Sequence, residues 1–233
     1  MAIVPRPAAD RGATRLPWLD GRHSFSFGDY HDPQWTQWGV LRVLNDDRIA
    51  PGGGFATHPH RDMEILTWVL DGALEHRDSM GTGAVIHPGE AQLMSAGTGV
   101  THSEFNHSKT APTRLLQIWF SPRAPGLPPG YQQRPFGDDE LRDRLCMIIA
   151  PDGRDGALVI HQDVTVQVAR LSPGGAVTHA PTSGRRAWVQ VARGDASVNG
   201  TTLHEGDGAG ITAEACVAIA SAPGAEVLLF DLP

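Results

Sequence analysis

The sequence predicts an all-β protein built as two domains, each a β-sandwich or a β-barrel. Short apolar segments recur at regular intervals from Gly39 onward, and turn residues separate them, which is typical of such folds. The chain contains 27 glycines and 18 prolines, a content that suits many tight turns and disfavours a helical protein. With 233 residues, the chain is long enough to give two such domains a full hydrophobic core.

The first 38 residues are expected to be largely irregular, because four prolines interrupt them. Residues 24–27 (SFSF) alternate polar and aromatic side chains, so we expect a short strand there. Disordered segments are normally poor in aromatic residues, and this arm is rich in them. We therefore expect the arm to pack on the body of the protein through Trp18, Phe25, Phe27, Trp35 and Trp38.

The rest of the first half contains further apolar segments with the length of strands. They are residues 40–44, 64–70, 74–77, 84–87, 91–94 and 114–121. Turn chemistry is predicted between them, at 45–47 (NDD), 71–72 (DG), 88–89 (PG) and 97–99 (GTG). The last segment has LLQIWF at its centre and is predicted to be a buried strand that closes the first domain.

A proline-rich stretch separates the two halves. Residues 122–135 contain five prolines, which indicates a linker rather than a packed element. We place the first domain at residues 1–122, the linker at 123–144 and the second domain at 145–233. A short helix is expected at 138–144, which begins with acidic residues. The second domain then has predicted strands at 145–150, 157–161, 164–171, 187–192, 215–220 and 227–232.

The second half faintly repeats the first. Residues 68–72 (WVLDG) are echoed by 191–194 (VARG), and 86–91 (IHPGEA) by 203–208 (LHEGDG). The repeat predicts two domains of similar build. Counting without gaps from these anchors gives the positions in the second half that match the histidine motifs described below. Ala180 and Thr182 fall at His58 and His60, and Ile219 and Ser221 fall at His102 and Glu104, so we expect no equivalent metal site in the second domain.

Composition excludes several classes of function. The net charge is −7 and the 19 basic residues are scattered, so direct binding to a nucleic acid is not expected. No apolar run approaches the roughly 20 residues that a membrane helix needs. Cys146 and Cys216 do not form a CxxC pair and are predicted to be buried, reduced thiols. A protein without a signal-like N-terminus and with few cysteines is expected in the cytoplasm.

Two histidine motifs carry the chemistry of the first half. Six of the 11 histidines lie between residues 52 and 107. His58 and His60 are two residues apart, as are His102 and Glu104, so in extended strands each pair projects to one face. Three imidazoles and a carboxylate that converge suit a transition metal: iron, manganese, cobalt, nickel, copper or zinc. A proline between two strand histidines indicates an edge strand or a bulge.

The alternative is that both motifs are idle. HPH could be a solvated surface loop, and HSE could be a turn. Both motifs together, each at same-face spacing and each flanked by glycine turns, favour the metal site.

Other residues are weaker candidates. His76 and Asp78 either line the pocket or form a satisfied pair in the barrel. Asn106 and His107 follow Glu104 closely and are candidates for orienting a ligand. Among the large apolar residues we expect a mainly core role, with one or two forming the wall of a substrate pocket: Trp68, Met94, Phe105 and Trp119. His161, His179 and His204 are isolated, and we assign them no role.

The motifs resemble those of the pirin family of the cupin superfamily. Residues 57–64 (THPHRDME) and 94–104 (MSAGTGVTHSE) are similar to the signatures of that family. Residues 18–20, 23–27, 41–47 and 226–233 resemble its bacterial branch, whose members are similar to quercetin 2,3-dioxygenase. The general cupin motifs match less closely, because Gly72 comes one residue late and Ser95 stands where a proline is usual. The resemblance runs along nearly the whole chain.

The resemblance implies a bicupin monomer, with two double-stranded β-helix (jelly-roll) barrels and the metal in the N-terminal one. By position, the metal ligands fall on His58, His60, His102 and Glu104, usually around one divalent iron. Glu64 is the cupin-motif carboxylate that pirins do not use as a ligand, so we interpret it as a supporting or structural residue.

The implied activity is a metal-dependent dioxygenase that cleaves the central ring of flavonols such as quercetin with O2 and releases CO. Glu104 would be both a metal ligand and the catalytic base, and the partners would be a small aromatic substrate and O2. The alternative is a metal-dependent, redox-sensing interaction protein, as eukaryotic pirins are transcriptional cofactors. That alternative requires a protein partner and no physiological catalysis.

Overall fold

The computed structural model describes residues 3–233, which form two compact units. The N-terminal unit contains residues 12–135 and 160–162, and the C-terminal unit contains residues 3–11, 136–159 and 163–233. Within residues 3–233, helix is confined to α1 (Asp138–Leu141) and two single 3-10 turns, Ala8–Asp10 and Arg154–Gly156. The all-β prediction is therefore confirmed. Within the described residues, no helix has the length and apolar character needed to span a membrane.

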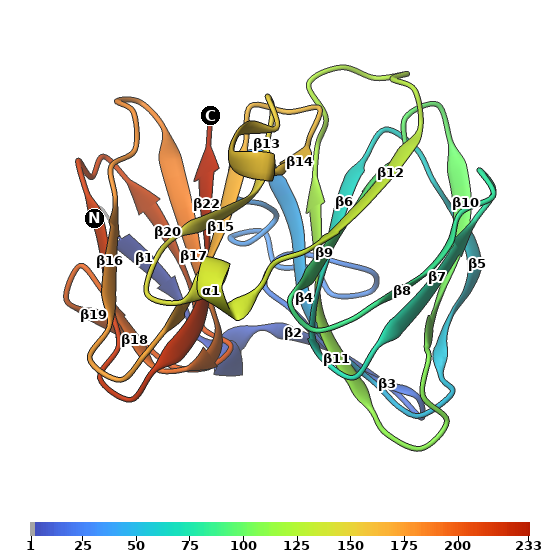
Figure 1. The fold of residues 1–233 in the computed structure, drawn as a ribbon, viewed down its shortest axis with the longest axis horizontal. Helices are drawn as coiled ribbons and strands as arrows, with labels where there is room; N and C mark the ends of the chain where they lie inside the picture. The colour runs from blue at the N-terminus through green and yellow to red at the C-terminus, as the bar shows by residue number, and fades with distance from the viewer. Residues whose placement is uncertain (1–2) are drawn as a thin grey trace. The chain divides into compact units, whose positions relative to one another are not determined.

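The N-terminal unit contains two antiparallel sheets (Figure 1). The larger sheet has seven strands, in the order β12 (Gly130–Pro135), β9 (Glu90–Ser95), β6 (Glu64–Asp71), β11 (Thr113–Phe120), β4 (Leu41–Ile49), β3 (Leu19–His23) and β2 (Gly12–Leu16). The smaller sheet has four strands, in the order β5 (Gly54–His60), β10 (Val100–Asn106), β7 (Leu74–Asp78) and β8 (Gly83–Ile86). One core cluster joins the two sheets through Leu19, Ile49, Val69, Leu74, Ile86 and Leu115.

A row of polar residues crosses the larger sheet. Backbone pairing places Gln92, Thr67, Gln117, Asn45 and His23 at one level on five neighbouring strands, β9, β6, β11, β4 and β3. All five side chains are buried. Buried polar groups persist only when they are hydrogen-bonded, so a row of this kind requires partners inside the unit. We call these five residues the polar belt.

Strand β5 lies at the edge of the smaller sheet and pairs with β10 alone. Pro59 has no backbone N–H, and an edge strand tolerates this because no second strand needs that donor. Its pairing with β10 shifts register, because His102 lies opposite His58 whereas Glu104 lies opposite Phe55. One extra residue on β5 makes this a β-bulge. The prediction of an edge strand or a bulge at this proline is confirmed by the edge position; Pro59 itself pairs in register with Thr101, and the bulge lies before His58.

The C-terminal unit repeats the order of the inner strands and of the four-stranded sheet, and differs at the outer strands of the larger sheet. Its seven-stranded sheet runs β1 (Ile3–Arg6), β20 (Gly208–Thr212), β17 (Arg186–Gly194), β22 (Ala225–Leu232), β15 (Thr165–Leu171), β13 (Cys146–Ala150) and β14 (Leu158–Val159). Its four-stranded sheet runs β16 (Ala176–His179), β21 (Val217–Ala220), β18 (Ala196–Val198) and β19 (Thr201–Leu203). The internal repeat seen in the sequence thus corresponds to two units with the same arrangement of inner strands, and the bicupin fold is confirmed.

The pairing corrects the alignment of the two halves. His102 pairs with His58 and Val100 with His60 on β10 and β5. On the matching strands, Ile219 pairs with Val177 and Val217 with His179. The count without gaps was therefore wrong by three residues for the first motif, since turn lengths differ between the units. The matching positions hold Val177, His179, Ile219 and Ser221, and His179 is bonded to Asp231 at 2.7 Å.

The N-terminal arm is more regular than expected. Strands β2 and β3 form a hairpin with a tight turn at Pro17 and Trp18, and Phe25 is buried with its ring 6.4 Å from that of Trp35. The expected packing of the arm is confirmed. The expected strand at 24–27 is wrong, because that segment bends and makes only one isolated bridge, between Phe27 and Tyr30.

Three further expectations also differ from the structure. The turn expected at 45–47 is strand, because Asn45 bonds His23 and Asp46 binds Arg114 through two hydrogen bonds of 2.9 Å. The proline-rich stretch 122–135 was expected to be a linker rather than a packed element, but its last residues form strand β12, which pairs with β9. Neither cysteine is buried: Cys146 is half-buried and Cys216 is exposed.

Candidate metal centre

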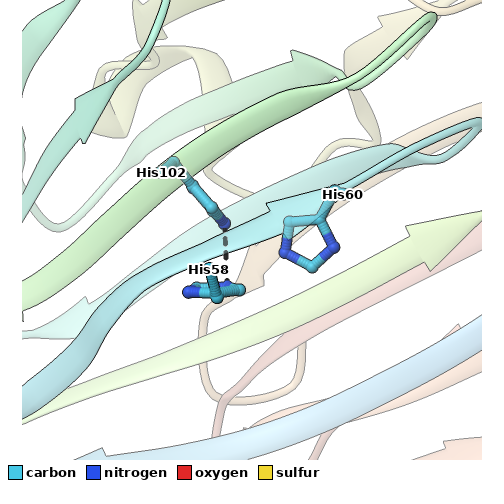
Figure 2. Close-up of side chains that lie close together, drawn as sticks. All are labelled: His58, His60 and His102. Atoms are coloured by element: carbon cyan, nitrogen blue, oxygen red, sulfur yellow. Dashed lines mark hydrogen bonds between the residues drawn. The ribbon is translucent and has the colours of Figure 1, made fainter.

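Three histidines converge between β5 and β10. Figure 2 shows His58 and His60 on one strand and His102 on the other, with the three rings turned toward one another. The ring centroids lie 4.8 Å apart for His58 and His60, 4.5 Å for His58 and His102, and 4.9 Å for His60 and His102. One nitrogen of each ring lies within 4.8 Å of the other two. This spacing allows one cation to contact all three imidazoles.

The alternation of the strands produces this convergence. His102 and Glu104 are two residues apart on β10 and both are buried, whereas Thr101 and Phe105 beside them are exposed. His58 and His60 project from the same face of β5 and are half-buried. The bulge lies on the N-terminal side of His58, so it leaves this pair in register with Val100 and His102. The two same-face pairs predicted from the sequence therefore meet.

A hydrogen bond selects one nitrogen on the ring of His58. His58 Nδ1 lies 2.8 Å from the carbonyl oxygen of Ala56, so Nδ1 carries the proton and donates it. This leaves the lone pair of His58 on Nε2, which lies 3.1 Å from Nε2 of His102. Two neutral nitrogens at this distance share no stable hydrogen bond unless one carries a proton, but both can contact a cation.

Burial keeps the imidazoles of His60 and His102 neutral. Desolvation, with a smaller contribution from the charge of His58, lowers the pKa of His60 from 6.5 to about 4. Desolvation and the neighbouring histidines likewise lower the pKa of His102 to about 3. At neutral pH both rings therefore offer a lone pair rather than a positive charge, as a metal ligand must.

Glu104 presents one unpaired carboxylate oxygen. Its Oε2 accepts a hydrogen bond of 2.8 Å from Nε2 of Gln117, whose Oε1 accepts one of 3.0 Å from the Thr67 hydroxyl. The Thr67 contact fixes the amide of Gln117 so that its NH2 faces Glu104. Glu104 Oε1 is buried and has no hydrogen-bond partner among residues 3–233. Burial raises the pKa of Glu104 to about 7, and the Gln117 bond opposes that rise.

Gln117 and Thr67 are functional candidates that the sequence analysis missed. Each is a single polar residue within an apolar strand, at the centre of LLQIWF and ILTWVL respectively. One polar side chain that interrupts a buried strand is costly unless it has a partner. That pattern was the available signal for the polar belt.

A cavity of about 410 Å³ opens over this site, within the range of about 300–1,000 Å³ typical of small-molecule pockets. His58, His60, Glu104 and Gln117 line it on the polar side. Its apolar wall is formed by Leu16, Trp18, Leu19, Phe27, Phe55 and Trp119. The Trp119 ring stands edge-on to His60 at 4.8 Å and to Phe27 at 5.5 Å. The cavity therefore combines an apolar wall with two of the three histidines and Glu104.

His76, His102 and Glu104 form a second group whose potential ligand atoms lie within 4.8 Å of one another. His102 belongs to both groups, and the same nitrogen of its ring cannot bind a metal ion in each of them. His76 is completely buried, and its Nε2 is bonded to Asp78 at 3.0 Å. His58 and His60 face the cavity instead, where a ligand has access. The geometry favours the group of three histidines as the site, with Glu104 beside it.

Glu64 lies apart from the three histidines. Its Oε2 accepts a hydrogen bond of 2.9 Å from the Ser95 hydroxyl, and its Oε1 lies 3.3 Å from Nδ1 of His161. The interpretation of Glu64 as a structural residue fits these contacts. His161 also lies 3.2 Å from Ser95, so it is not isolated. His179 and His204 likewise have acidic partners, Asp231 and Asp195.

Asn106 and His107 do not orient the histidine ligands. The Asn106 amide donates to the carbonyl oxygens of Ile49, Ala50 and Ala111, so it fixes neighbouring loops. His107 is exposed and bonds Glu75 at 3.3 Å.

The predicted roles of the large apolar residues are mostly confirmed. Trp68 and Met94 are core residues, and Trp119 lines the cavity. Phe105 is exposed rather than in the core, because it faces away from Glu104 on β10.

Gln117→Leu is expected to weaken metal uptake at pH 7 about tenfold or more. The substitution removes the donor that stabilises the ionised form of Glu104, and a hydrogen bond to a charged group contributes roughly 1.5–3 kcal/mol. Competition with a chelator would measure the affinity. Gln133→Leu is the matched control, because Gln133 bonds Val85 and Glu90 instead. Equal affinities for the two variants would show that Gln117 does not support the site.

Comparison with known proteins agrees with the geometry. Residues 6–120 match the protein family described as Pirin, and residues 147–232 match the one described as Quercetinase C-terminal cupin domain. The chain is 45% identical over 231 residues to a protein named Quercetin 2,3-dioxygenase from Escherichia coli K12, with 99% of both chains covered.

Two solved structures are also similar. The crystal structure of YhhW from Escherichia coli superimposes with a TM-score of 0.96 at 44% identity, covering 99% of this chain and 97% of that one. The structure of the bacterial pirin YhhW in complex with nickel(II) gives a TM-score of 0.95 at 44% identity, with 99% of both chains covered.

Proposed function

We propose that the chain, which belongs to the pirin family, is a metal-dependent dioxygenase acting on flavonols such as quercetin. The reaction would break two carbon–carbon bonds of the central ring, place both atoms of O2 in the ring-opened ester and carboxylate, and release the carbon between them as CO. The observation that carries the proposal is the convergence of three imidazoles at the edge of an apolar cavity that Glu104 also lines, with one carboxylate oxygen that has no partner within residues 3–233.

The residues present fit a transition metal. Neutral imidazole nitrogen together with one carboxylate oxygen suits the first-row divalent metals, and the buried Glu104 Oε1 lacks any other partner within the described chain. We propose that His58, His60, His102 and Glu104 hold one divalent ion, with iron(II) as the native metal. Manganese, cobalt, nickel, copper and zinc suit the same donors. When bound, the ion would act as a Lewis acid toward the substrate oxygens.

Glu104 is proposed as the base. Burial raises its pKa to about 7 before a metal binds, which makes this carboxylate a stronger base than an exposed one. It would accept the proton of the flavonol 3-hydroxyl, because the deprotonated substrate is the electron-rich form that reacts with oxygen. Gln117 holds the carboxylate in place through Oε2.

The apolar wall would orient the substrate. Phe27, Phe55 and Trp119 present ring faces and edges to the cavity, and together with Trp18 they exclude water from the reacting carbons. A planar three-ring substrate would be held with its hydroxyl end toward the histidines.

Oxygen consumption tests the proposal directly. Protein loaded separately with iron(II), manganese(II), cobalt(II) or nickel(II) is mixed with quercetin, while oxygen uptake and CO release are followed. Equal amounts of O2 consumed and CO formed are expected with at least one metal. No turnover by protein shown to carry a full complement of each metal would refute the activity and leave the metal centre standing.

Two further proposals accompany this function and rest on the sequence alone. We propose that the protein is a monomer and that it acts in the cytoplasm. Light scattering coupled to size-exclusion chromatography would give the mass of the particle, which for a monomer is 25.0 kDa. Fractionation of the producing cell would give the location.

A further inference from the structure

A chain of buried polar groups extends from His102 away from the cavity. His102 Nδ1 lies 3.4 Å from Nδ1 of His76, and Nε2 of His76 lies 3.0 Å from Oδ2 of Asp78. The side chains of His76 and Asp78 are 0% exposed. Backbone pairing between β10 and β7 creates the chain, because it places His102 opposite Asp78 and Glu104 opposite His76.

The far end of this chain is fixed by the backbone. Asp78 Oδ1 accepts hydrogen bonds from the backbone N–H groups of Met80 and Thr82, at 2.9 and 3.0 Å. These two donors hold the carboxylate in one orientation, so Oδ2 always faces His76. The ring of Tyr131 packs on His76 with 5.0 Å between centroids and limits its rotation. The chain therefore has defined geometry at each position.

The direction of the protons follows from that geometry. Asp78 can only accept, so His76 donates from Nε2 and its lone pair lies on Nδ1. The lone pair of His76 Nδ1 then accepts from His102, which places the proton of His102 on Nδ1 and its lone pair on Nε2. His102 Nε2 is the nitrogen that lies 3.1 Å from Nε2 of His58. The chain of hydrogen bonds thus leaves the lone pair of His102 Nε2, the nitrogen that faces the metal site, available for a metal ion.

We propose that His76 and Asp78 are positioning residues that fix the tautomer and orientation of His102 for metal binding. This inference rests on the metal centre of the proposed function. A histidine ligand usually donates its outer N–H directly to a carboxylate or a carbonyl oxygen, and here an imidazole stands between ligand and carboxylate. The interposed ring carries the polarity of Asp78 across the smaller sheet to the metal site.

Asp78→Asn reverses that polarity without changing the size of the side chain. The backbone donors of Met80 and Thr82 still require an acceptor, so they hold the amide oxygen at the position of Oδ1. The amide NH2 then faces His76 and donates to its Nε2. His76 must then carry its proton on Nδ1 and donate it to Nδ1 of His102. Neutral His102 therefore carries its own proton on Nε2, which is the nitrogen that should bind the metal.

His76→Asn disrupts packing but preserves the hydrogen-bond polarity at His102. It removes most of a buried ring, but the Asn oxygen can occupy the position of His76 Nδ1 and accept the His102 proton. A purely structural role predicts that this cavity-forming change is the more harmful of the two. The positioning role predicts the reverse order for metal affinity.

Cobalt(II) binding to the apo form of the full chain separates these outcomes. Affinity is measured by competition with a chelator, the visible cobalt spectrum reports the ligand set, and thermal unfolding of the apoprotein reports stability. We expect Asp78→Asn to weaken cobalt binding about 10- to 100-fold and to alter the spectrum. His76→Asn should bind more tightly than Asp78→Asn despite lower thermal stability. The control is His107→Asn, which changes an exposed histidine directly after β10. Its cobalt affinity and spectrum should match those of the wild type.

Two results would overturn the inference. Wild-type affinity and spectrum in Asp78→Asn would show that proton polarity is irrelevant, and weaker binding by His76→Asn than by Asp78→Asn would assign the pair a packing role. If the wild-type protein does not bind cobalt at all, the metal centre itself fails. That result is distinct, because the inference concerns only variants of a protein that binds.

Discussion

The double variant His58→Ala/His60→Ala is expected to lose both its metal and its oxygen uptake with quercetin. Two of the three converging imidazoles disappear, and the remaining pair, His102 and Glu104, cannot hold a divalent ion against water and buffer. Removing a Lewis acid that contributes several kcal/mol to the transition state lowers the rate by about 10³-fold or more. Metal analysis after desalting and an oxygen electrode measure the two losses.

The matched control is His87→Ala/His107→Ala. These histidines belong to the same unit but are exposed and lie outside the cavity. Wild-type metal content and rate are expected for the control. His58 and His60 are themselves half-buried edge-strand residues, so the test variant should fold, which circular dichroism verifies. A test variant that keeps its metal and its rate would show that His58 and His60 are not metal ligands.

Glu104→Gln is expected to lower kcat by about 10²–10⁴-fold when the rate is expressed per bound metal ion. Glutamine has the size of glutamate and its oxygen can still accept from Gln117. It cannot take a proton from the substrate hydroxyl, and it is a weaker ligand because it carries no charge. KM should change less than kcat, since the apolar wall that holds the substrate is untouched.

The pH dependence of metal uptake tests the carboxylate as a ligand. In the metal-free protein, burial raises the pKa of Glu104 to about 7, and a cation binds the ionised carboxylate. The metal affinity of the wild type should therefore increase with pH until about pH 7 and then level off. Glu104→Gln should lack this rise. Turnover by fully loaded Glu104→Gln at the wild-type rate would eliminate the carboxylate as the base.

The sequence was a good guide where local periodicity decides the structure. The same-face spacing of His58 with His60 and of His102 with Glu104 follows from the two-residue period of a strand, and the structure brings the two pairs together. Pro59 correctly indicated an edge strand. The all-β class followed equally well from turn chemistry.

The sequence was a poor guide where long-range pairing decides. The segment 45–47 has the composition of a turn, but tertiary partners such as His23 and Arg114 make it strand. Nothing local indicates that Gln117 would meet Glu104, or that His76 would stand behind His102, because strand order creates these contacts. His179 was taken as isolated for the same reason, since its partner Asp231 lies 52 residues away.

Anomalous-difference crystallography of metal-loaded protein tests the central claim most directly. One peak is predicted per chain, in the N-terminal unit, at about 2.0–2.2 Å from the Nε2 atoms of His58 and His102, from a ring nitrogen of His60 and from Oε1 of Glu104. A peak among His76, His102 and Glu104 would contradict this assignment, as would a peak in the C-terminal unit or the absence of any peak in protein that contains stoichiometric metal.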